Sequence, residues 1–423
     1  MSASSRRASL AGGLVKGLIV LSCVGATAFE RSFSSLLDAT LGQSASSRAL
    51  FEYERVYQWI VSSGERELVP RHTAIVDLAA DGSAKPGLHR ICEQRAVVAD
   101  VLRRVAEARP TVVVLDKFFL PDACEADDPG TAALRAALAE VTARTPVVVG
   151  RAIETTALGE DGVEVEIEER LAPALAFPDA DPERLREGVV NVSEDWRRAA
   201  LVFWARTGET DDAGRPLWGK LPSLALAAAL AHEQGELSSA RLRRMVAEGR
   251  EPYVSFSPPN ALRLVTPQQL RDDPAAVQRL AGRVVVIGET QPAFDVHDTP
   301  FGRVAGFRLQ ASYVEALIDG RVFHPAPWWL AFGLAAVYGG GILTLTQRVR
   351  WHRAQRLAGV LALTASTFVA AWLAARLFGV YIGPFALGPM GLVGVVAGLA
   401  ADSAAQHLER FRPPAAPVKE NAA

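Results

Sequence analysis

The stretch Arg283–Phe323, RVVVIGETQPAFDVHDTPFGRVAGFRLQASYVEALIDGRVF, decides the fold of this chain. It opens with Val284–Ile287, an unbroken apolar run ending at Gly288, which is typical of a strand buried on both faces of a parallel sheet. A polar loop follows, and apolar residues then return at helical spacing from Leu309 to Leu317. Because α/β sheets bind ligands beside the carboxyl ends of their strands, this loop is a candidate for a binding site.

The preceding sequence alternates between short buried strands and amphipathic helices. Apolar runs predict strands at Thr73–Asp77, Val112–Asp116 and Pro146–Gly150, and helical spacing predicts helices at Arg95–Ala108 and Thr131–Ala143. This alternation predicts parallel pairing with right-handed crossovers. The expected fold class is therefore an α/β domain with a mainly parallel sheet.

The sequence between Arg151 and Arg186 is less regular, and the pattern recovers after it. Further strands are predicted at Val189–Val192, Ala199–Trp204 and Tyr253–Phe256, with a turn at Asp211–Gly214. Helices are predicted at Leu224–His232 with Ser223 as N-cap, at Ser238–Glu248, and at Pro267–Leu280, which Gly282 ends.

Apolar segments at both ends of the chain predict membrane spans. The expected division is a membrane anchor at residues 1–29, an exported domain at 30–325, three transmembrane helices at 326–401 and a cytoplasmic tail at 402–423. Because Ala26–Ala28 also resembles a signal-peptidase site, residues 1–29 are either an uncleaved anchor or a cleaved signal peptide. Both alternatives export the domain that follows.

Charge predicts the orientation of these segments. Four arginines lie between Arg348 and Arg356, and the positive-inside rule places this loop in the cytoplasm. We therefore expect a multi-pass membrane protein, in contact with lipid, with its large domain outside. The formal net charge of -2 over 423 residues gives no electrostatic basis for a nucleic-acid partner.

Polar residues that follow the predicted strands are the candidates for ligand binding. If the strands of Asp77 and Asp116 are neighbours, both carboxylates face one crevice, where His297 and Asp298 would add imidazole and oxygen donors for a ligand or a metal ion. Alternatively, each aspartate caps the amides of the following turn, and His297 is only a hydrogen-bond partner. The full candidate set is Asp77, Asp116, Lys117, Glu289, His297, Asp298 and Thr299.

Four further residues are predicted to have structural roles. Asn191 falls in a predicted strand that disfavours its residue type, so we expect it to hold neighbouring loops together. Gly288 would allow a close backbone approach, Pro300 would end regular structure, and Gly302 would free the backbone. The sequence contains no Walker motif and no GxSxG, so we predict neither a cofactor nor a catalytic nucleophile.

Cys92 and Cys124 are candidates for a disulfide bond in an oxidising compartment. Cys92 is expected in the loop before the first helix and Cys124 in the loop after the second strand. Parallel strands with one crossover place both loops at the same edge, so the sulfurs could meet if the two strands are neighbours. The alternative is two unpaired thiols.

Several segments, in the right order, resemble the type-2 CHASE domain, a cyclase- and histidine-kinase-associated extracellular sensor. They are TAIVD at Thr73–Asp77, TVVVLDKFF at Thr111–Phe119, GVVNV at Gly188–Val192, LPSLALAAA at Leu221–Ala229 and RVVVIGETQPAFDVHDTPFG at Arg283–Gly302. The resemblance covers Thr73–Phe323 and implies a bacterial envelope sensor, in the inner membrane, whose exported domain detects a signal and passes it through the membrane spans.

The resemblance also implies how the signal would be used. Members of the family commonly continue into a cyclase, kinase or phosphatase domain, and none follows in this sequence. We therefore expect a sensory or adaptor protein, not an enzyme, that binds an unknown small ligand and acts on a separate signalling or membrane protein. The alternatives are a membrane-bound enzyme with an Asp/His site and a structural partner of an envelope complex.

Overall fold

The computed structural model describes residues 69–80, 91–125, 127–158, 166–193, 197–211, 213–255, 261–290, 295–299, 302–327 and 353–382, with isolated positions between 329 and 344. The chain divides into two compact units. One is Ser62–His324, and the other consists of Met1–Val61 and Pro325–Ala423. The sheet and the candidate site belong to the first unit.

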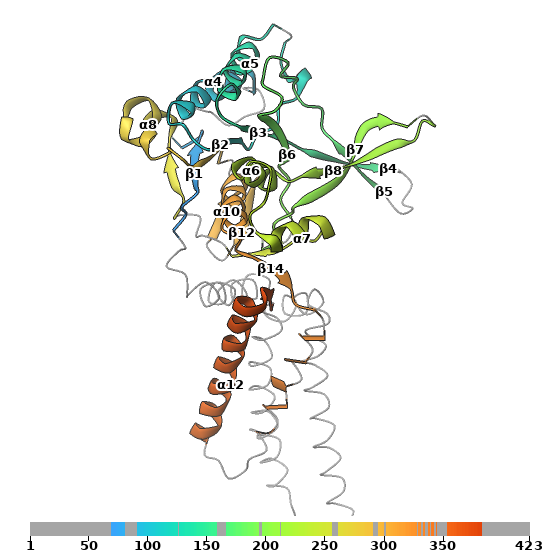
Figure 1. Ribbon diagram of the computed structural model, residues 1–423, viewed down its shortest axis with the longest axis vertical. Helices are drawn as coiled ribbons and strands as arrows, with labels where there is room; N and C mark the ends of the chain where they lie inside the picture. The colour runs from blue at the N-terminus through green and yellow to red at the C-terminus, as the bar shows by residue number, and fades with distance from the viewer. Residues whose placement is uncertain are drawn as a thin grey trace, which may run out of the picture. The chain divides into compact units, whose positions relative to one another are not determined.

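A six-stranded parallel sheet forms the centre of the unit Ser62–His324 (Figure 1). Its strand order is β10-β1-β11-β2-β3-β6. The strands are β1 (Thr73–Asp77), β2 (Val112–Leu115), β3 (Val147–Arg151), β6 (Leu185–Val189), β10 (Arg263–Val265) and β11 (Val284–Gly288). The predicted α/β class with a parallel sheet is confirmed.

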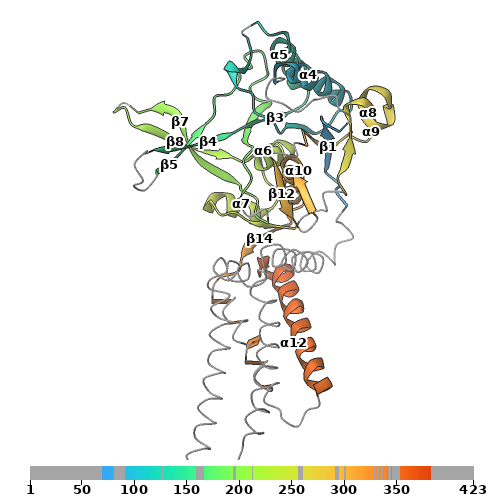
Figure 2. The ribbon, with the colours of Figure 1, turned by 180° about the vertical axis from the view of Figure 1, so that it is seen from behind.

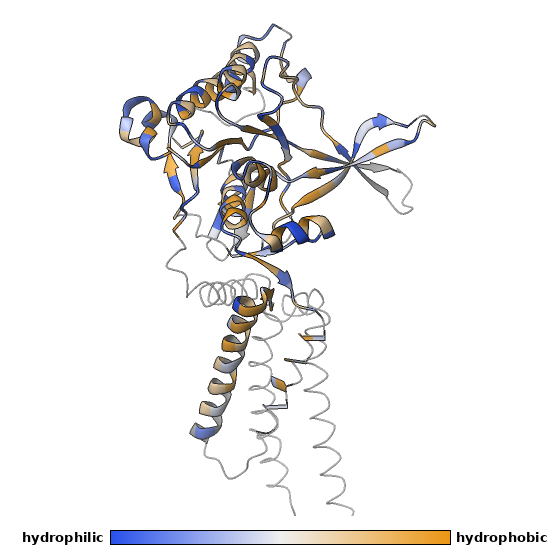
Figure 3. Ribbon diagram, viewed as in Figure 1, coloured by the Kyte–Doolittle hydropathy of each residue, from blue (hydrophilic) through white to orange (hydrophobic). Residues whose placement is uncertain are grey.

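Strand β11 shows why the central strands are continuously apolar. It pairs with β1 on one side and β2 on the other, with Thr73 opposite Val284 and Val284 opposite Val112. Val284 and Val286 belong to one hydrophobic core, and Val285 and Ile287 belong to the second core on the other face. Both faces are covered, so every position must be apolar. Figure 3 shows this apolar character along the central strands.

Helices cover both faces of the sheet (Figures 1 and 2). The core that contains Val285 also includes residues of α4 (Ile91–Glu107), α5 (Pro129–Thr142), α8 (Pro267–Asp272) and α9 (Pro274–Gln278). The opposite core is built from α6 (Leu224–His232), α7 (Ala240–Glu248) and α10 (Gly306–Ile318). Ser223 caps α6 as predicted, because its hydroxyl accepts a hydrogen bond from the Leu226 amide at 3.1 Å.

A second, four-stranded sheet with the order β4-β5-β7-β8 projects from the side of this core (Figure 1). It consists of β4 (Ile153–Leu158), β5 (Glu166–Leu171), β7 (Val202–Thr210) and β8 (Pro216–Pro222). Of these strands, only one was predicted, at Ala199–Trp204, and β7 begins later and runs further than that. Residues 153–171 were expected to be irregular; their Glu- and Thr-rich strands lack the apolar run that marks a buried strand.

Three other elements differ from the prediction. Strand β6 ends at Val189, so Asn191 lies after a strand and not within one. The helix expected at Pro267–Leu280 is divided into α8 and α9, because Pro274 cannot continue the first helix and Asp273 caps the second through the Ala275 amide at 2.9 Å. The loop expected to carry His297–Thr299 contains a hairpin of β12 (Val296–Thr299) and β13 (Gly302–Ala305).

The predicted membrane segments remain predictions. No helix within the described residues is long and apolar enough to cross a membrane. Residues 10–29 and 383–399 lie outside the part of the chain that is described, as does much of 327–345. Residues 357–375 fall on α12 (Arg353–Leu373) and the first positions of the π-helix Ala374–Phe378.

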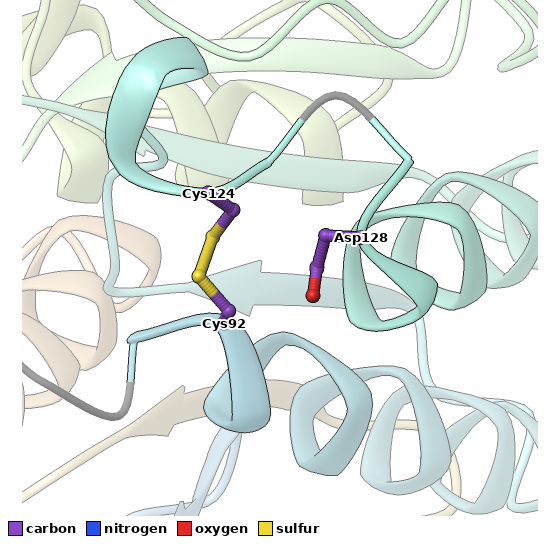
Figure 4. Close-up of side chains that lie close together, drawn as sticks. All are labelled: Cys92, Cys124 and Asp128. Carbon is purple, nitrogen blue, oxygen red and sulfur yellow. A yellow bond between two sulfur atoms is a disulfide. The ribbon is translucent and has the colours of Figure 1, made fainter.

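The predicted disulfide between Cys92 and Cys124 is present, with a Cα–Cα distance of 5.7 Å (Figure 4). The reasoning behind it was wrong in two respects. Strand β11 lies between β1 and β2, so the two strands are not neighbours, and Cys92 lies in the first turn of α4 and not in a loop. The sulfurs meet because α4 packs closely on α5: a Cβ at Gly130 would be 2.3 Å from the Cys92 carbonyl oxygen.

Removing this disulfide is expected to destabilise the domain. The bond closes a loop of 32 positions, for which the chain-entropy model gives about 3–4 kcal/mol. We predict that Cys92→Ala and Cys124→Ala each lower the free energy of unfolding by roughly this amount, measured by denaturant titration without reductant. The double variant should lose no more than either single variant. Additive losses, or an equal response of wild type and variants to reductant, would contradict a shared bond.

A side chain at position 288 is expected to be destabilising. A Cβ built on Gly288 would lie 2.4 Å from the Cβ of Phe307, in the first turn of α10. Gly288→Ala should therefore cost about 1–3 kcal/mol of unfolding free energy by overpacking. The same change should cost less in a Phe307→Gly background, which lacks the side-chain atoms that this Cβ would meet, and a double-mutant cycle measures the coupling. Strict additivity of the two changes would show that this contact is not the cause.

Candidate functional site

The loops after β1, β11 and β2 meet at the carboxyl edge of the sheet. Asp77 is the last residue of β1, Glu289 follows β11, and Asp116 follows β2. Because β11 is the middle strand of the three, the loop that begins at Glu289 lies between the two aspartates. The sequence placed these residues at one edge, but it did not indicate that Asp77 and Asp116 are separated by a strand.

Asp77 is fully engaged by its neighbours. Its side chain is 2% exposed and forms an ion pair with Arg308, whose Nη2 lies 3.2 Å from Oδ2. The same oxygen accepts a hydrogen bond from the Thr290 hydroxyl at 2.6 Å, and Oδ1 accepts from the amides of Ala79 at 3.1 Å and Thr290 at 3.2 Å. The geometry therefore favours the capping alternative for Asp77, which ties the loop after β11 to β1 and α10.

Lys117 and Glu289 form an ion pair above β2 and β11. Lys117 Nζ lies 2.5 Å from Glu289 Oε2 and 3.3 Å from the side-chain oxygen of Gln94. The Glu289 side chain is 2% exposed, and its other oxygen, Oε1, has no hydrogen-bond partner among the described residues. A buried carboxylate oxygen without a donor is costly, so this position favours a bound group that donates a hydrogen bond or carries positive charge.

Asp116 is the most perturbed acid of the site. Its pKa is raised to about 8, chiefly by desolvation on burial and next by the carboxylate of Asp295, while the Lys117 charge acts in the opposite direction. The residue as a whole keeps some accessible surface. Asp116 therefore holds a proton at neutral pH. A cation bound next to the carboxyl group could displace this proton.

Asp295 connects this acid to His297 and to helix α10. Its Oδ1 lies 3.4 Å from His297 Nε2, and its carbonyl oxygen accepts a hydrogen bond from the Gly306 amide at 3.0 Å. A Cβ at Gly306 would collide with the Asp295 carboxylate, which shows that this charge lies against the first turn of α10. Negative charge is favourable there, because the amino end of a helix is partially positive.

The remaining predicted residues either have structural roles or lie outside the described residues. Thr299 is buried, and its hydroxyl donates to the Gly302 carbonyl at 2.8 Å within the hairpin. Gly302 has a φ of 96°, in the left-handed region that favours glycine. Asn191 accepts a hydrogen bond from the Ile153 amide at 2.9 Å, which joins the end of β6 to β4. The side chain of Asp298 and the whole of Pro300 lie outside the described residues.

Sequence reasoning missed four residues of this site. Gln94, Thr290, Asp295 and Arg308 all contact or act on predicted members. Asp295 and Thr290 could have been included, because they lie in the loop that was already singled out. Gln94 and Arg308 lie on helices that only the tertiary packing brings to this edge.

Chemically, the site holds an excess of carboxyl groups. Asp77 is paired with Arg308 and Glu289 with Lys117, whereas the carboxylate of Asp295 raises the pKa of Asp116 and lies 3.4 Å from His297 Nε2. Such an arrangement suits an ammonium or guanidinium group, or an inorganic cation, and repels anions.

Replacing Asp116 should make the domain more stable at neutral and alkaline pH. The folded-state pKa of about 8 exceeds the ordinary value of 3.8, so the free energy of unfolding falls as pH rises between these two values. Linkage sets the slope at up to about 1.4 kcal/mol per pH unit. Asp116→Asn should remove this fall, and the exposed Asp179→Asn should keep it. Denaturant titrations at pH 5, 6, 7 and 8 test this; equal slopes for wild type and Asp116→Asn would refute the shifted pKa.

The comparisons with known proteins support the sensor resemblance. A family model described as the CHASE2 domain matches residues 37–345, which extends beyond Thr73–Phe323 at both ends. Neither the curated proteins nor the solved structures gave a significant match to the chain. The family match covers well over half of the sequence and includes the whole parallel sheet. This chain therefore belongs to the CHASE2 family of extracellular sensor domains.

Proposed function

We propose that this chain is a sensory protein of the bacterial inner membrane. Its extracytoplasmic domain binds a small cationic ligand at the carboxyl edge of the sheet and relays the signal to a separate membrane or signalling protein. Family membership supports the sensory role. The ligand assignment is supported by the burial of Asp116 and the nearby charge of Asp295, which raise the Asp116 pKa to about 8, because a bound cation would stabilise both groups as carboxylates.

The loop carrying Asp295 also offers a route for the signal. Asp295 is hydrogen-bonded to Gly306, the first residue of α10, and Arg308 in the same turn pairs with Asp77. A ligand that moves Asp295 therefore acts directly on the start of α10. This helix ends at Ile318, and β14 (Val322–Pro325) follows it, immediately before the predicted membrane segments. We propose that a shift of α10 reaches the spans through this short connection, and that the partner contacts the spans within the lipid.

Ligand binding should be linked to proton release from Asp116. Below pH 8 a cation must displace a proton, so the affinity for a cationic ligand should rise by up to tenfold per pH unit as pH approaches 8. We predict that a thermal-shift screen of the full-length protein against amines, guanidinium compounds and inorganic cations finds ligands whose stabilisation is larger at pH 8 than at pH 6.

Matched variants distinguish this site from general charge effects. Asp116→Asn should remove most of the stabilisation by such a ligand, and Asp179→Asn, which changes an exposed aspartate, should retain it. Isothermal titration in buffers of different ionisation enthalpy measures the proton released. Stabilisation that survives Asp116→Asn, or that is largest for anionic compounds, would refute the assignment. Conversion of the ligand to a product would favour the enzyme alternative.

A further inference from the structure

A second group of polar side chains lies at the opposite, amino edge of the sheet. His72 immediately precedes β1, while Glu315 lies in the last turn of α10 and Asp319 is the C-cap of that helix. One donor atom from each of these residues lies within 4.8 Å of the other two. None of the three takes part in the carboxyl-edge site, and none was singled out by its sequence pattern.

We propose that His72, Glu315 and Asp319 bind a divalent transition-metal ion, with Zn²⁺ as the best-matched ion. The set provides one imidazole nitrogen and two carboxylates, which are ligands of zinc sites with three protein donors and one open position. Because imidazole suits Zn²⁺ better than the harder Mg²⁺ and Ca²⁺, which prefer oxygen donors alone, the mixed set favours a transition metal.

The His72–Asp319 contact has the geometry of such a pair of ligands. His72 Nε2 lies 3.0 Å from Asp319 Oδ1. Two tetrahedral donors, each at about 2.0–2.1 Å from zinc, are separated by about 3.3 Å, so the ion can replace the shared proton with only a small movement. The second oxygen of Asp319 accepts a hydrogen bond from Arg321 Nε at 3.0 Å, which orients the carboxylate and leaves Oδ1 directed to His72.

Glu315 is held rigidly beside this pair. It is 0% exposed, and its carboxylate accepts hydrogen bonds from the backbone amides of Arg71 at 2.6 Å and His72 at 3.1 Å. A carboxylate oxygen has more than one lone pair, so these bonds leave capacity for a metal. The side chains of His72 and Asp319 are 35% and 20% exposed, which gives an ion access from solvent.

A second histidine supports the orientation of the first. The rings of His72 and His232 meet edge to face, with centroids 5.8 Å apart. His232 ends α6, and its Nδ1 lies 3.0 Å from the Thr111 hydroxyl just before β2. This contact limits rotation of the His72 ring, as packing and outer hydrogen bonds do for metal-binding histidines.

The position of the site gives it a mechanical role. His72 lies where the chain enters β1, and Asp319 lies where it leaves α10. These are the two segments through which the unit Ser62–His324 continues into the rest of the chain. A bound ion would therefore cross-link the entrance and the exit of the sensory unit, independently of any ligand at the carboxyl edge.

The test is zinc binding by the full-length protein, freed of metal and kept without reductant. Non-reducing conditions matter because Cys92, Cys124 and Asp128 form a second group of possible metal ligands (Figure 4). The disulfide keeps the two cysteine sulfurs from binding zinc as thiolates. Isothermal titration with ZnCl₂ should show a site for which millimolar Mg²⁺ does not compete. His72→Gln and Asp319→Asn should each weaken zinc binding at this site at least tenfold, whereas the control His324→Gln, in β14 and outside both sites, should leave it unchanged.

A measurement on the wild-type protein decides the case even where a variant fails to fold. Zn²⁺ should protect His72, but not His324, from modification by diethyl pyrocarbonate, read by peptide mass spectrometry. Unchanged affinity in both His72→Gln and Asp319→Asn would overturn the proposal. An equal loss of binding in His324→Gln, or modification of His72 that zinc does not slow, would overturn it as well.

Discussion

The insertion of β11 between β1 and β2 is the constraint on which the rest of this domain depends. It gives the sheet a centre that is covered on both faces, and it explains why five consecutive positions from Val284 to Gly288 are buried. It also determines the polar chemistry of the carboxyl edge. The loop after β11 lies between the ends of β1 and β2, so Thr290 reaches Asp77 while Glu289 reaches Lys117. The loop after one buried strand thus supplies a hydrogen bond to one neighbouring strand and an ion pair to the loop after the other.

Much of the parallel core could be predicted because its signals are local. Strands buried on both faces appear in the sequence as unbroken apolar runs. Helices such as α6 are recognised from the helical spacing of their apolar residues and from the N-cap residue next to them. The projecting sheet could not be predicted in the same way. Strands β4 and β5, IETTAL and EIEERL, contain no apolar run, and only pairing with their neighbours defines them. Strand order was equally hidden, since β10 and β11 join β1 from far along the chain.

The candidate site shows the same limit at the level of single residues. Placing Asp77 and Asp116 at one edge needed only the direction of parallel strands. Their different environments depend on partners that packing supplies: Arg308 and Thr290 compensate Asp77, while Asp116 is desolvated next to another carboxylate. The residue type and the strand position are the same, and only the tertiary contacts separate a structural aspartate from a titratable one. The disulfide was predicted from a strand order that is wrong, because Cys92 reaches Cys124 through the packing of α4 on α5.

The late position of β11 in the chain has a consequence for biosynthesis. Asp77 and Thr290, which meet in the finished domain, are 213 positions apart in sequence. A polypeptide made from its amino end therefore produces β1 and β2 long before the strand that separates and covers them. Until then, both present unpaired hydrogen-bonding edges that can associate with other chains. Closing so distant a contact is also slow. The nascent chain therefore needs protection from aggregation until β11, the last strand of the sheet in chain order, has been synthesised.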